Sequence, residues 1–419
     1  MDRLNDPSKP LKICYLARYT GGGSAISLQT IVSNLDRSRF LPIVLFHRIK
    51  NHELVAALRA RDIPVFSLTE PYYFSATSSA FKVNVTGRLS RSTWQRKLLS
   101  LYQLGKATGA FIKQDLKLIR PLLHFLNEHQ VDLIHFNSGL STHRADLLVS
   151  NWLGIPAICH VRAFETLTPL ERFVGRKVKR FFYISQAIAQ DYQNQKIAPH
   201  RGQIIHNVVS PPPLITPAEK MALRAEFGWD ETHFVVVNVG RLVSWKGQDV
   251  FIKAIDCLAP RLPHLRGLLV GKADDNPGSY NYAQNLQQLV TDKGLTDKVI
   301  FAGFRSDAVR LMAAADVVVH SATTPEPFGR VIIEGLATGT AVVATNDGGV
   351  ADIITPGVNG MLVTPGDDSE MARTIEELAH NPTLRAKLGQ AGYEHVKENF
   401  SVAGQLKQLE QAYLACLTR

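Results

Sequence analysis

The chain has 419 residues, 45% of them hydrophobic, which is more than one hydrophobic core usually supports and predicts two domains of about 200 residues each. Its net charge of +10 is unevenly spread, because residues 1–207 hold 28 Lys and Arg against 13 Asp and Glu, and residues 208–419 hold 19 against 24. No apolar run approaches the ~20 residues of a membrane span, which disfavours transmembrane anchoring. The first ten residues lack an export signal's apolar core, which disfavours export. The four cysteines form no C-x-x-C pair, which disfavours a disulfide framework.

These features predict a cytoplasmic protein whose cysteines, Cys14, Cys159, Cys257 and Cys416, are reduced core residues. The basic first half is expected to face an anionic partner, either phospholipid, phosphorylated glycan or nucleic acid.

Short apolar strands alternate with helices through the first half, which predicts parallel βαβ units. The first unit is a strand over Lys12–Ala17, a glycine loop at 21–23 and a helix capped by Ser24. Further strands are expected at 42–46, 63–67, 131–136 and 155–161, and further helices at 53–60 and 144–153.

The segment 72–120 interrupts this alternation. It carries nine Lys and Arg against the single acid Asp115, interleaved with aromatic and aliphatic residues. Such an insertion suits an anionic membrane interface, but a solvated helical hairpin that covers the sheet edge is an equal alternative. A second basic cluster at 172–180 favours the membrane slightly.

The run Pro211–Pro213 predicts a stiff linker at the domain boundary. After it, a second doubly wound domain is expected, with ligand sites where the parallel strands end. Its strands are expected at 234–239, 268–270, 299–301, 317–320 and 341–344, its helices at 249–258, 283–292 and 308–314, and a last helix at 402–417.

Two carboxylates, Glu326 and Glu334, flank a Pro-rich turn and the start of a helix expected over 329–338. Because helical side chains tilt toward the N-terminus, we expect Glu334 to reach the same pocket as Glu326, beside the backbone amides of Phe328 and Gly329. A Glu pair at this spacing also arises by chance, so the neighbouring motifs decide its meaning.

Two cations, Arg241 and Lys246, follow the strand 234–239 on a loop between Gly240 and Gly247. A guanidinium that can fork two oxygens and a compact ammonium suit a pyrophosphate, although an isolated pair of this kind is usually solvated.

Other strand ends carry weaker signals. Gly303–Phe304 and the loop Asn346–Gly349 offer backbone amides or are ordinary turns. In the first half, His135, Asn137, His160 and Arg162 end two strands, and a lone strand-end His is more often structural than catalytic. No metal-ligand set is expected, because Asp274–Asp275 lacks a third ligand and His135 and His143 lack a carboxylate at ligand spacing.

The motifs GRLVSWKGQ from Gly240, FAGF from Phe301, EPFGRVIIE from Glu326 and NDGG from Asn346 together resemble the retaining family 4 glycosyltransferases. In the first half GGGS from Gly21, GIPAICHVR from Gly154 and YISQAIA from Tyr183 agree. The resemblance implies the GT-B fold, with two Rossmann-like domains facing across a cleft. Residues 1–207 would form the acceptor domain, 208–395 the nucleotide-sugar domain, and 396–419 a C-terminal helix that packs back.

The resemblance also implies roles for single residues. Arg241 and Lys246 would grip the donor's diphosphate, Glu334 the ribose hydroxyls and Glu326 the sugar. The remaining donor-binding positions implied are Gly22, Gly23, Gly240, Gly303, Phe304, Phe328, Gly329, Gly348 and Gly349, and His160 would hydrogen-bond the sugar. Two departures from the pattern are Arg162, where a small or acidic residue is frequent, and Asp352, where Glu is usual.

The implied reaction is front-face transfer of a sugar from a nucleotide-diphosphate sugar to a glycan or lipid-linked acceptor, with retained configuration and without a metal or other cofactor. The protein would work in cell-surface polysaccharide or glycolipid biosynthesis, in the cytoplasm or peripherally on the inner face of the membrane. A non-catalytic nucleotide-sugar or glycan-binding protein on the same fold is the alternative. A dehydrogenase is disfavoured because no G-x-G-x-x-G follows the first strand, and nucleic-acid binding leaves the second-half motifs unexplained.

Overall fold

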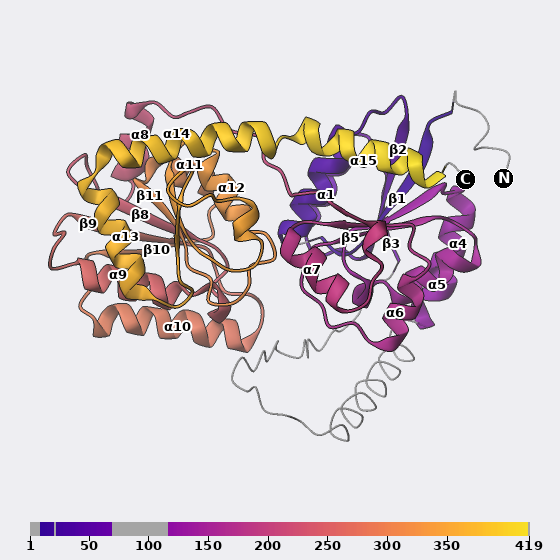
Figure 1. The fold of residues 1–419 in the computed structure, drawn as a ribbon, viewed down its shortest axis with the longest axis horizontal. Coiled ribbons are helices and arrows are strands. Elements are labelled where there is room, and N and C mark those ends of the chain that lie inside the picture. The colour runs from indigo at the N-terminus through magenta and orange to yellow at the C-terminus, as the bar shows by residue number, and fades with distance from the viewer. Residues whose placement is uncertain (1–8, 21, 69–115, 418–419) are drawn as a thin grey trace, which may run out of the picture. The chain divides into compact units, whose positions relative to one another are not determined.

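The computed structural model describes residues 9–20, 22–68 and 116–417, which fold into two compact units with one parallel sheet each (Figure 1). The first unit comprises Met1–Tyr183, Ile188–Ile205 and Leu406–Arg419, and the second comprises Ile184–Ala187 and His206–Gln405. The expected insertion at 72–120 lies outside the described residues, except for its last five positions.

The first sheet has seven strands in the order β3-β2-β1-β4-β5-β6-β7, all parallel. The strand order reverses between β1 and β4, and this is the switch point where the carboxyl ends of strands usually receive ligands. The strands are β1 (Leu11–Tyr19), β2 (Phe40–Arg48), β3 (Val65–Ser67), β4 (Leu133–Phe136), β5 (Ala157–Val161), β6 (Arg180–Tyr183) and β7 (Gly202–Ile204).

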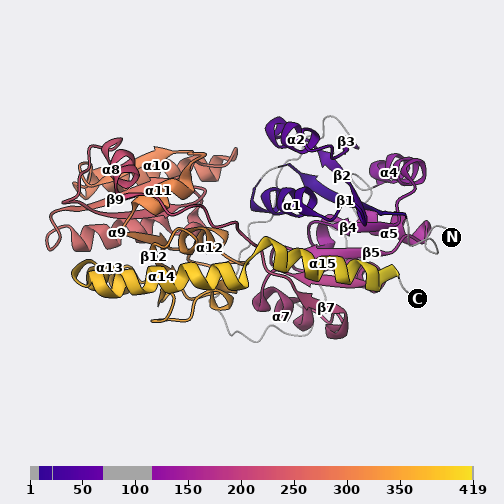
Figure 2. The same ribbon diagram turned by 90° about the horizontal axis from the view of Figure 1, so that it is seen from above.

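The helices of the first unit cover its sheet, as Figure 2 shows from above. They are α1 (Gly23–Asn34), α2 (His52–Arg59), α4 (Leu116–His129), α5 (Arg144–Trp152), α6 (Pro169–Gly175) and α7 (Gln186–Asn194). The C-terminal helix α15 (Val402–Leu417) joins this unit from Leu406 onward. Its buried Tyr413 packs edge-on against Tyr15 of β1 and Phe40 of β2.

The second sheet has six parallel strands in the order β10-β9-β8-β11-β12-β13. They are β8 (Phe234–Val239), β9 (Leu265–Val270), β10 (Val299–Gly303), β11 (Val317–His320), β12 (Ala341–Thr345) and β13 (Met361–Val363). The helices are α8 (Pro217–Ala225), α9 (Gln248–Leu258), α10 (Pro277–Asp292), α11 (Ala308–Ala314), α12 (Arg330–Leu336), α13 (Asp368–His380) and α14 (Pro382–Asn399).

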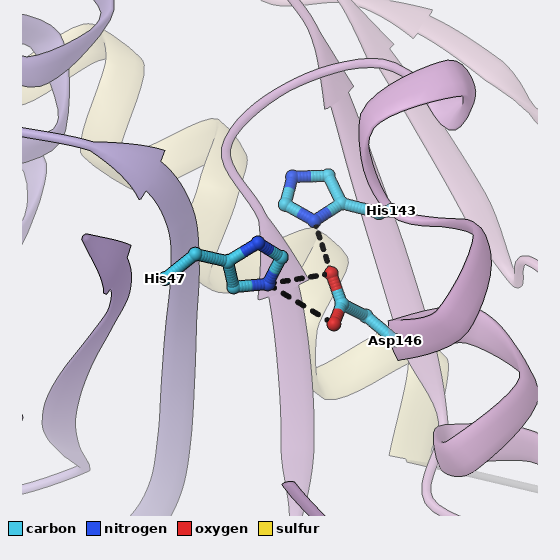
Figure 3. Close-up of side chains that lie close together, drawn as sticks. All are labelled: His47, His143 and Asp146. Atoms are coloured by element: carbon cyan, nitrogen blue, oxygen red, sulfur yellow. Dashed lines mark hydrogen bonds and ion pairs between the residues drawn. The ribbon is translucent and has the colours of Figure 1, made fainter. Parts of the chain in front are cut away.

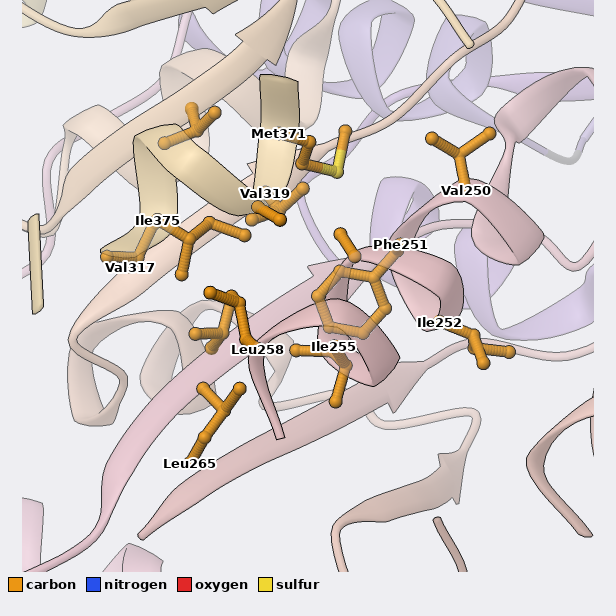
Figure 4. Close-up of a cluster of buried hydrophobic side chains, with 14 of the residues drawn as sticks. Val250, Phe251, Ile252, Ile255, Leu258, Leu265, Val317, Val319, Met371 and Ile375 are labelled. Atoms are coloured by element: carbon orange, nitrogen blue, oxygen red, sulfur yellow. The ribbon is translucent and has the colours of Figure 1, made fainter. Parts of the chain in front are cut away.

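One core of the second unit lies between this sheet and the helices α9, α10 and α13 (Figure 4). Phe251 and Ile255 of α9 are fully buried and meet Met371 and Ile375 of α13 over the valines of β11. The continuous apolar runs of β8, β11 and β12 are what a sheet buried on both faces requires. This rigid sheet fixes the loops that follow its strands.

The predicted fold class is confirmed, with two parallel α/β sheets and a long C-terminal helix. The expected bounds of β8, α11, β11 and α15 agree with the structure. The prediction that Ser24 caps the first helix is wrong, because α1 begins at Gly23 and Gly22 is its N-cap with φ 78°. Glycine adopts this left-handed backbone without the strain that a side chain brings.

The expected core placement of the cysteines is half right. All four are free thiols, and Cys14 and Cys159 are buried, whereas Cys257 is exposed and Cys416 lies between. Burial raises the pKa of the Cys14 and Cys159 thiols, so both stay protonated and unreactive. None of the helices in the described ranges combines the length and hydropathy needed to cross a membrane.

Candidate active site

Glu326 is a buried acidic side chain of the second unit with two side-chain partners. It lies in the loop between β11 and α12 and is only 7% exposed. Its Oε2 accepts hydrogen bonds from Lys246 Nζ at 2.5 Å and from His320 Nε2 at 3.1 Å. Lys246 comes from the loop between β8 and α9, so the loops after two adjacent strands bring a cation and a carboxylate to one point.

The backbone of Glu326 is held as firmly as its side chain. It forms a parallel bridge with Gly348, and the Gly349 N–H donates to the Glu326 carbonyl at 2.7 Å. A Cβ on Gly348, whose φ is 68°, would clash with the Glu326 backbone, so glycine is required there. The Gly348 amide donates to Asp347 Oδ1 at 2.8 Å. The expectation of free amides in this loop is therefore wrong at both glycines.

The electrostatics keep Glu326 ionised. Burial alone would raise the pKa of this carboxyl, but Lys246 and His320 outweigh it and lower the pKa to about 2. Burial lowers the pKa of His320 despite the opposing effect of Glu326, so this ring is neutral near pH 7. The pair thus consists of a buried carboxylate and an ammonium beside a neutral imidazole.

The two predicted diphosphate-binding cations both lie after β8 and have different acidic partners. Arg241 Nη1 donates to Asp274 Oδ2 at 2.6 Å, and the Arg241 side chain is 55% exposed. Lys246 is held between Glu326 and the ring of Trp245, whose centroid lies 4.2 Å from Nζ. Because Lys246 has three N–H donors, it can bind Glu326 and a further anion together.

Glu334 lies in the second turn of α12, where Arg330 binds its Oε1 through Nη2 at 2.7 Å and Nε at 3.1 Å. No hydrogen bond joins Glu334 to Glu326 within the described ranges, so their shared pocket stays a prediction. Phe328 is 2% exposed and packs with the rings of His206 and Phe400, which leaves only its backbone for a ligand. Gly329, with φ 98°, is the N-cap of α12.

Gly303 ends β10 with φ 67°, and the next residue, Phe304, is 70% exposed. Lys272 Nζ lies 5.6 Å from the centre of the Phe304 ring. At the neighbouring strand end, the Gly240 N–H donates to the Val270 carbonyl. These positions lie at the same carboxyl edge of the second sheet as Arg241, where a base could stack on the open ring.

In the first unit, His160 is the next-to-last residue of β5 and is completely buried. Its Nδ1 accepts from Arg162 Nη2 at 3.2 Å and lies 3.3 Å from His135 Nε2. Burial first, then the charge of Arg162, lowers the pKa of His160. Within the described residues, His160 Nε2 has no hydrogen bond that satisfies both the distance and the angle criteria. The nearby backbone of Ile205 raises the pKa of His160 and so opposes the two larger effects.

The unusual Arg162 therefore has a structural reason. Its Nε donates to Asn137 Oδ1 at 2.9 Å, and Asn137 Nδ2 donates to the Ser24 carbonyl at 3.0 Å. This chain of bonds connects the end of β5 with the start of α1, beside Gly22 and Gly23. The expected gathering of strand-end polar residues in the first unit is present.

One cluster that could hold a metal was missed. His47 of β2, together with His143 and Asp146 at the start of α5, brings three buried ligand groups to one point (Figure 3). Asp146 Oδ2 lies 2.7 Å from His143 Nδ1 and 3.0 Å from His47 Nε2. The statement that His143 lacks a carboxylate at ligand spacing is wrong, since Asp146 lies three residues on.

Hydrogen bonding alone also explains that cluster. Despite burial, His47 and His143 lower the pKa of Asp146 well below its usual value, so the carboxylate is ionised and accepts from both rings. Distances of 2.7 to 3.1 Å are ordinary hydrogen-bond lengths.

Sequence reasoning missed His320, which contacts Glu326, and Thr345, which contacts His320. Thr345 Oγ1 lies 3.3 Å from His320 Nδ1. His320 is the last residue of β11, so the same strand-end criterion that selected His160 would have found it. Asp352 stands where Glu is usual in the family. Its Oδ2 accepts a hydrogen bond from the backbone N–H of Gln186 at 2.6 Å and lies 3.2 Å from His206 Nε2.

Two parallel α/β sheets with a long C-terminal helix are the architecture of the GT-B fold class. Two family models match the sequence, Glycosyltransferase Family 4 over residues 51–211 and Glycosyl transferases group 1 over residues 219–395. The chain belongs to the family 4 glycosyltransferases.

The curated relatives align with part of the chain. The lipopolysaccharide core biosynthesis glycosyltransferase LpsE of Rhizobium meliloti is 36% identical over 183 residues, which are 44% of this chain and 49% of LpsE. A GDP-mannose-dependent monoacylated alpha-(1-6)-phosphatidylinositol monomannoside mannosyltransferase of Corynebacterium glutamicum is 32% identical over 192 residues, 44% of this chain and 48% of that protein. The chain spans about half the length of these relatives.

Structural likeness extends over nearly the whole chain. The crystal structure of Anabaena Alr3699/HepE in complex with UDP has a TM-score of 0.78 and 26% identity, covering 97% of this chain and 100% of that one. The same protein in complex with UDP-glucose also has a TM-score of 0.78, with 25% identity over 97% of this chain and 100% of that one.

Proposed function

We propose that the protein is a retaining glycosyltransferase, which moves a sugar from a nucleotide-diphosphate sugar to a hydroxyl of a glycan or lipid-linked acceptor. The observation that carries the proposal is the Lys246–Glu326 pair, an ammonium 2.5 Å from a buried carboxylate at adjacent strand ends. Such a pair offers one cation for a leaving phosphate and one acceptor for sugar hydroxyls. Relatives named for lipopolysaccharide core and phosphatidylinositol mannoside synthesis support a role in cell-surface polysaccharide or glycolipid assembly.

The proposed donor contacts follow the strand ends of the second unit. Arg241 and Lys246 bind the diphosphate, and Glu334 binds the ribose through Oε2, the oxygen that Arg330 leaves open. Glu326 meets the sugar, and the base lies against Gly303 and Phe304. Gly240, Gly329 and the Phe328 backbone complete the donor site, while Gly348 and Gly349 contribute by holding Glu326 in place.

In the first unit, Gly22 and Gly23 are proposed to approach the donor at the N-terminus of α1. His160 is proposed to hydrogen-bond the sugar through Nε2, the ring atom with no protein partner of full geometry in the described ranges. Because His160 is completely buried, this contact requires its covering residues to move when the donor binds.

The proposed reaction is front-face displacement with retention. The bond from the anomeric carbon to the diphosphate breaks while the acceptor hydroxyl attacks the same face and gives its proton to the leaving phosphate oxygen. Negative charge then grows on the diphosphate, where Arg241 and Lys246 stabilise it. No step requires a metal, so we expect transfer to continue in the presence of a chelator.

Binding of nucleotides to the full chain tests this function. UDP and GDP are screened by the shift in melting temperature, since a ligand that binds only the folded state raises that temperature. The structural neighbour with UDP and UDP-glucose favours uridine, and the mannosyltransferase relative makes GDP-mannose the second choice. We expect one diphosphate to stabilise the protein and its sugar nucleotide to be slowly hydrolysed or transferred. No shift with any nucleoside diphosphate would reject the assignment.

A non-catalytic binding protein on the same fold is the alternative. It would bind the same nucleotide sugar but release no diphosphate. The Lys246 ammonium beside the ionised Glu326 favours catalysis, because a cation placed at the leaving diphosphate stabilises the charge that grows there during transfer. Release of nucleoside diphosphate from the sugar nucleotide separates the two functions.

We further propose that the first unit works at an anionic membrane surface, on the inner face. The described surface of the first unit carries two exposed rings, Trp152 at 76% on α5 and Phe173 at 62% on the adjacent α6. Exposed cations follow at Arg176, Lys177 and Lys179. Aromatic rings beside cations suit an interface of anionic lipid.

Liposome flotation tests this surface. Wild-type protein is expected to float with vesicles that contain phosphatidylglycerol and less with phosphatidylcholine alone, and Phe173→Ser is expected to float less. Tyr280→Ser in the second unit, an equally open ring at 55%, serves as the control and should float like wild type. Equal recovery with both lipids would contradict the proposal.

A further inference from the structure

His320 is the one partner of Glu326 to which the proposed mechanism gives no task. It ends β11, is 3% exposed, and has both ring nitrogens engaged. Its Nε2 lies 3.1 Å from Glu326 Oε2, and its Nδ1 lies 3.3 Å from Thr345 Oγ1, at the end of the adjacent strand β12.

The direction of each hydrogen bond follows from the chemistry of the partners. Glu326 is an ionised carboxylate and only accepts, so the ring proton must be on His320 Nε2. A neutral imidazole then has a lone pair on Nδ1, which the Thr345 hydroxyl can satisfy as the donor. Burial lowers the pKa of His320 and so supports the neutral ring. Glu326 therefore determines which nitrogen of His320 carries the proton, and the Thr345 hydroxyl holds the other nitrogen in place.

Both donors to Glu326 bind the same carboxylate oxygen. Lys246 and His320 meet at Oε2, whereas Oε1 has no hydrogen bond within the part of the chain that the structure describes. Two donors from different strand ends prevent the carboxylate from rotating about its terminal bond. Lys246 divides its three N–H donors between Glu326 and the proposed diphosphate, whereas His320 Nε2 donates to Oε2 alone.

We propose that His320, oriented by Thr345, is a positioning residue that holds Glu326 Oε2 and thereby presents Oε1 to the hydroxyls of the donor sugar. This inference rests on the proposed role of Glu326 in binding the sugar. It adds His320 and Thr345, which lie outside the motif that begins at Glu326. A positioning role predicts loss of recognition of the sugar while recognition of the nucleotide is kept. A merely structural role predicts loss of both together, or of neither.

The test compares affinities for UDP and UDP-glucose by calorimetry, or for GDP and GDP-mannose if the nucleotide screen selects guanosine. The measured quantity is the ratio of the two dissociation constants, which isolates the contribution of the sugar. His320→Leu is expected to reduce this contribution about 10- to 100-fold, the usual effect of losing a hydrogen bond to a charged group. His320→Gln, whose amide keeps an N–H donor, should recover most of it.

Thr345→Val removes only the hydroxyl that orients the ring, and we expect a smaller loss than for His320→Leu. Thr340→Val is the matched control, because Thr340 is another buried threonine of the second unit, bonded to Thr338 and the Met312 carbonyl and without contact to Glu326. All variants are checked by thermal melting and by their affinity for the diphosphate alone.

The outcomes separate this inference from the proposed function. If wild-type protein binds no nucleoside diphosphate, the function itself fails. If wild type binds both ligands and His320→Leu keeps the full contribution of the sugar, only the positioning role is overturned. An equal loss of diphosphate and sugar-nucleotide affinity in His320→Leu and His320→Gln also overturns it, in favour of a structural histidine.

Discussion

Replacing Lys246 by alanine is expected to abolish sugar transfer, with a loss in kcat of at least about 100-fold, the usual cost of removing one preorganised electrostatic partner. Two effects act together. The leaving diphosphate loses a cation, and the buried Glu326 loses the ammonium at 2.5 Å that keeps its pKa low. Steady-state kinetics at several pH values measure the result. The residual activity should begin to fall at a higher pH than that of wild type, because the pKa of Glu326 rises when Lys246 is removed.

Two variants control this experiment. Lys246→Arg keeps the charge but changes its shape, and it should retain more activity than Lys246→Ala. Lys253→Ala removes a lysine of the same unit that is 44% exposed and pairs only with Asp249 on its own helix, so transfer should stay unchanged. Lys246→Ala should still melt cooperatively, though at a lower temperature, since it leaves Glu326 buried without its cation. Turnover near the wild-type rate would reject the role of Lys246.

The strands could be predicted from the sequence because they are buried on both faces. Runs such as Phe234–Val239 and Val317–His320 are apolar except for Asn238 and the last residue, His320, and the structure confirms both ranges. The elements that were missed have weaker signals. The strand Arg180–Tyr183 begins with a cation, and the helix Pro382–Asn399 is so polar around its circumference that no apolar stripe marks it. Tertiary packing, not local pattern, defines such elements.

Of the candidate site, the sequence could supply the chemical groups but not their pairing. Strand-end position and residue type were enough to select Arg241 and Lys246, and the Pro-rich turn before a helix was enough to select Glu326. That Lys246 would bond Glu326, and Arg241 Asp274, depends on side-chain directions in loops and on which strands are neighbours in the sheet. The sequence also left open whether the loop Asn346–Gly349 offers free amides or is an ordinary turn, and in the structure both glycine amides have partners, Asp347 for Gly348 and Glu326 for Gly349.

Replacing Glu326 by alanine is expected to abolish sugar transfer. The isosteric Glu326→Gln should lower the transfer rate nearly as much, by at least about 100-fold. Gln keeps an oxygen that can accept from His320 and Lys246, so the remaining loss measures the charge itself. The folded-state pKa of Glu326, about 2, lies below its ordinary value of 4.5. Ionised Glu326 therefore stabilises the fold fully above pH 4.5, and this stability is lost as the pH falls toward 2. In Glu326→Gln, the difference in stability between neutral and acid pH should shrink.

Urea unfolding of Glu326→Gln and wild type at pH 7 and pH 3 measures the predicted change in the pH dependence of stability. Initial transfer rates measure the predicted loss of activity. Glu370→Gln is the matched control, since Glu370 also accepts a hydrogen bond, from the Thr364 amide at 2.7 Å, but lies on α13 away from Glu326. It should transfer sugar at the wild-type rate. Because the carboxylate is ionised throughout the neutral range, a wild-type acid limb above pH 4 must come from another group. If that limb disappeared in Glu326→Gln, the low pKa of Glu326 would be wrong, and with it the view that Lys246 holds a permanent anion beside the leaving group.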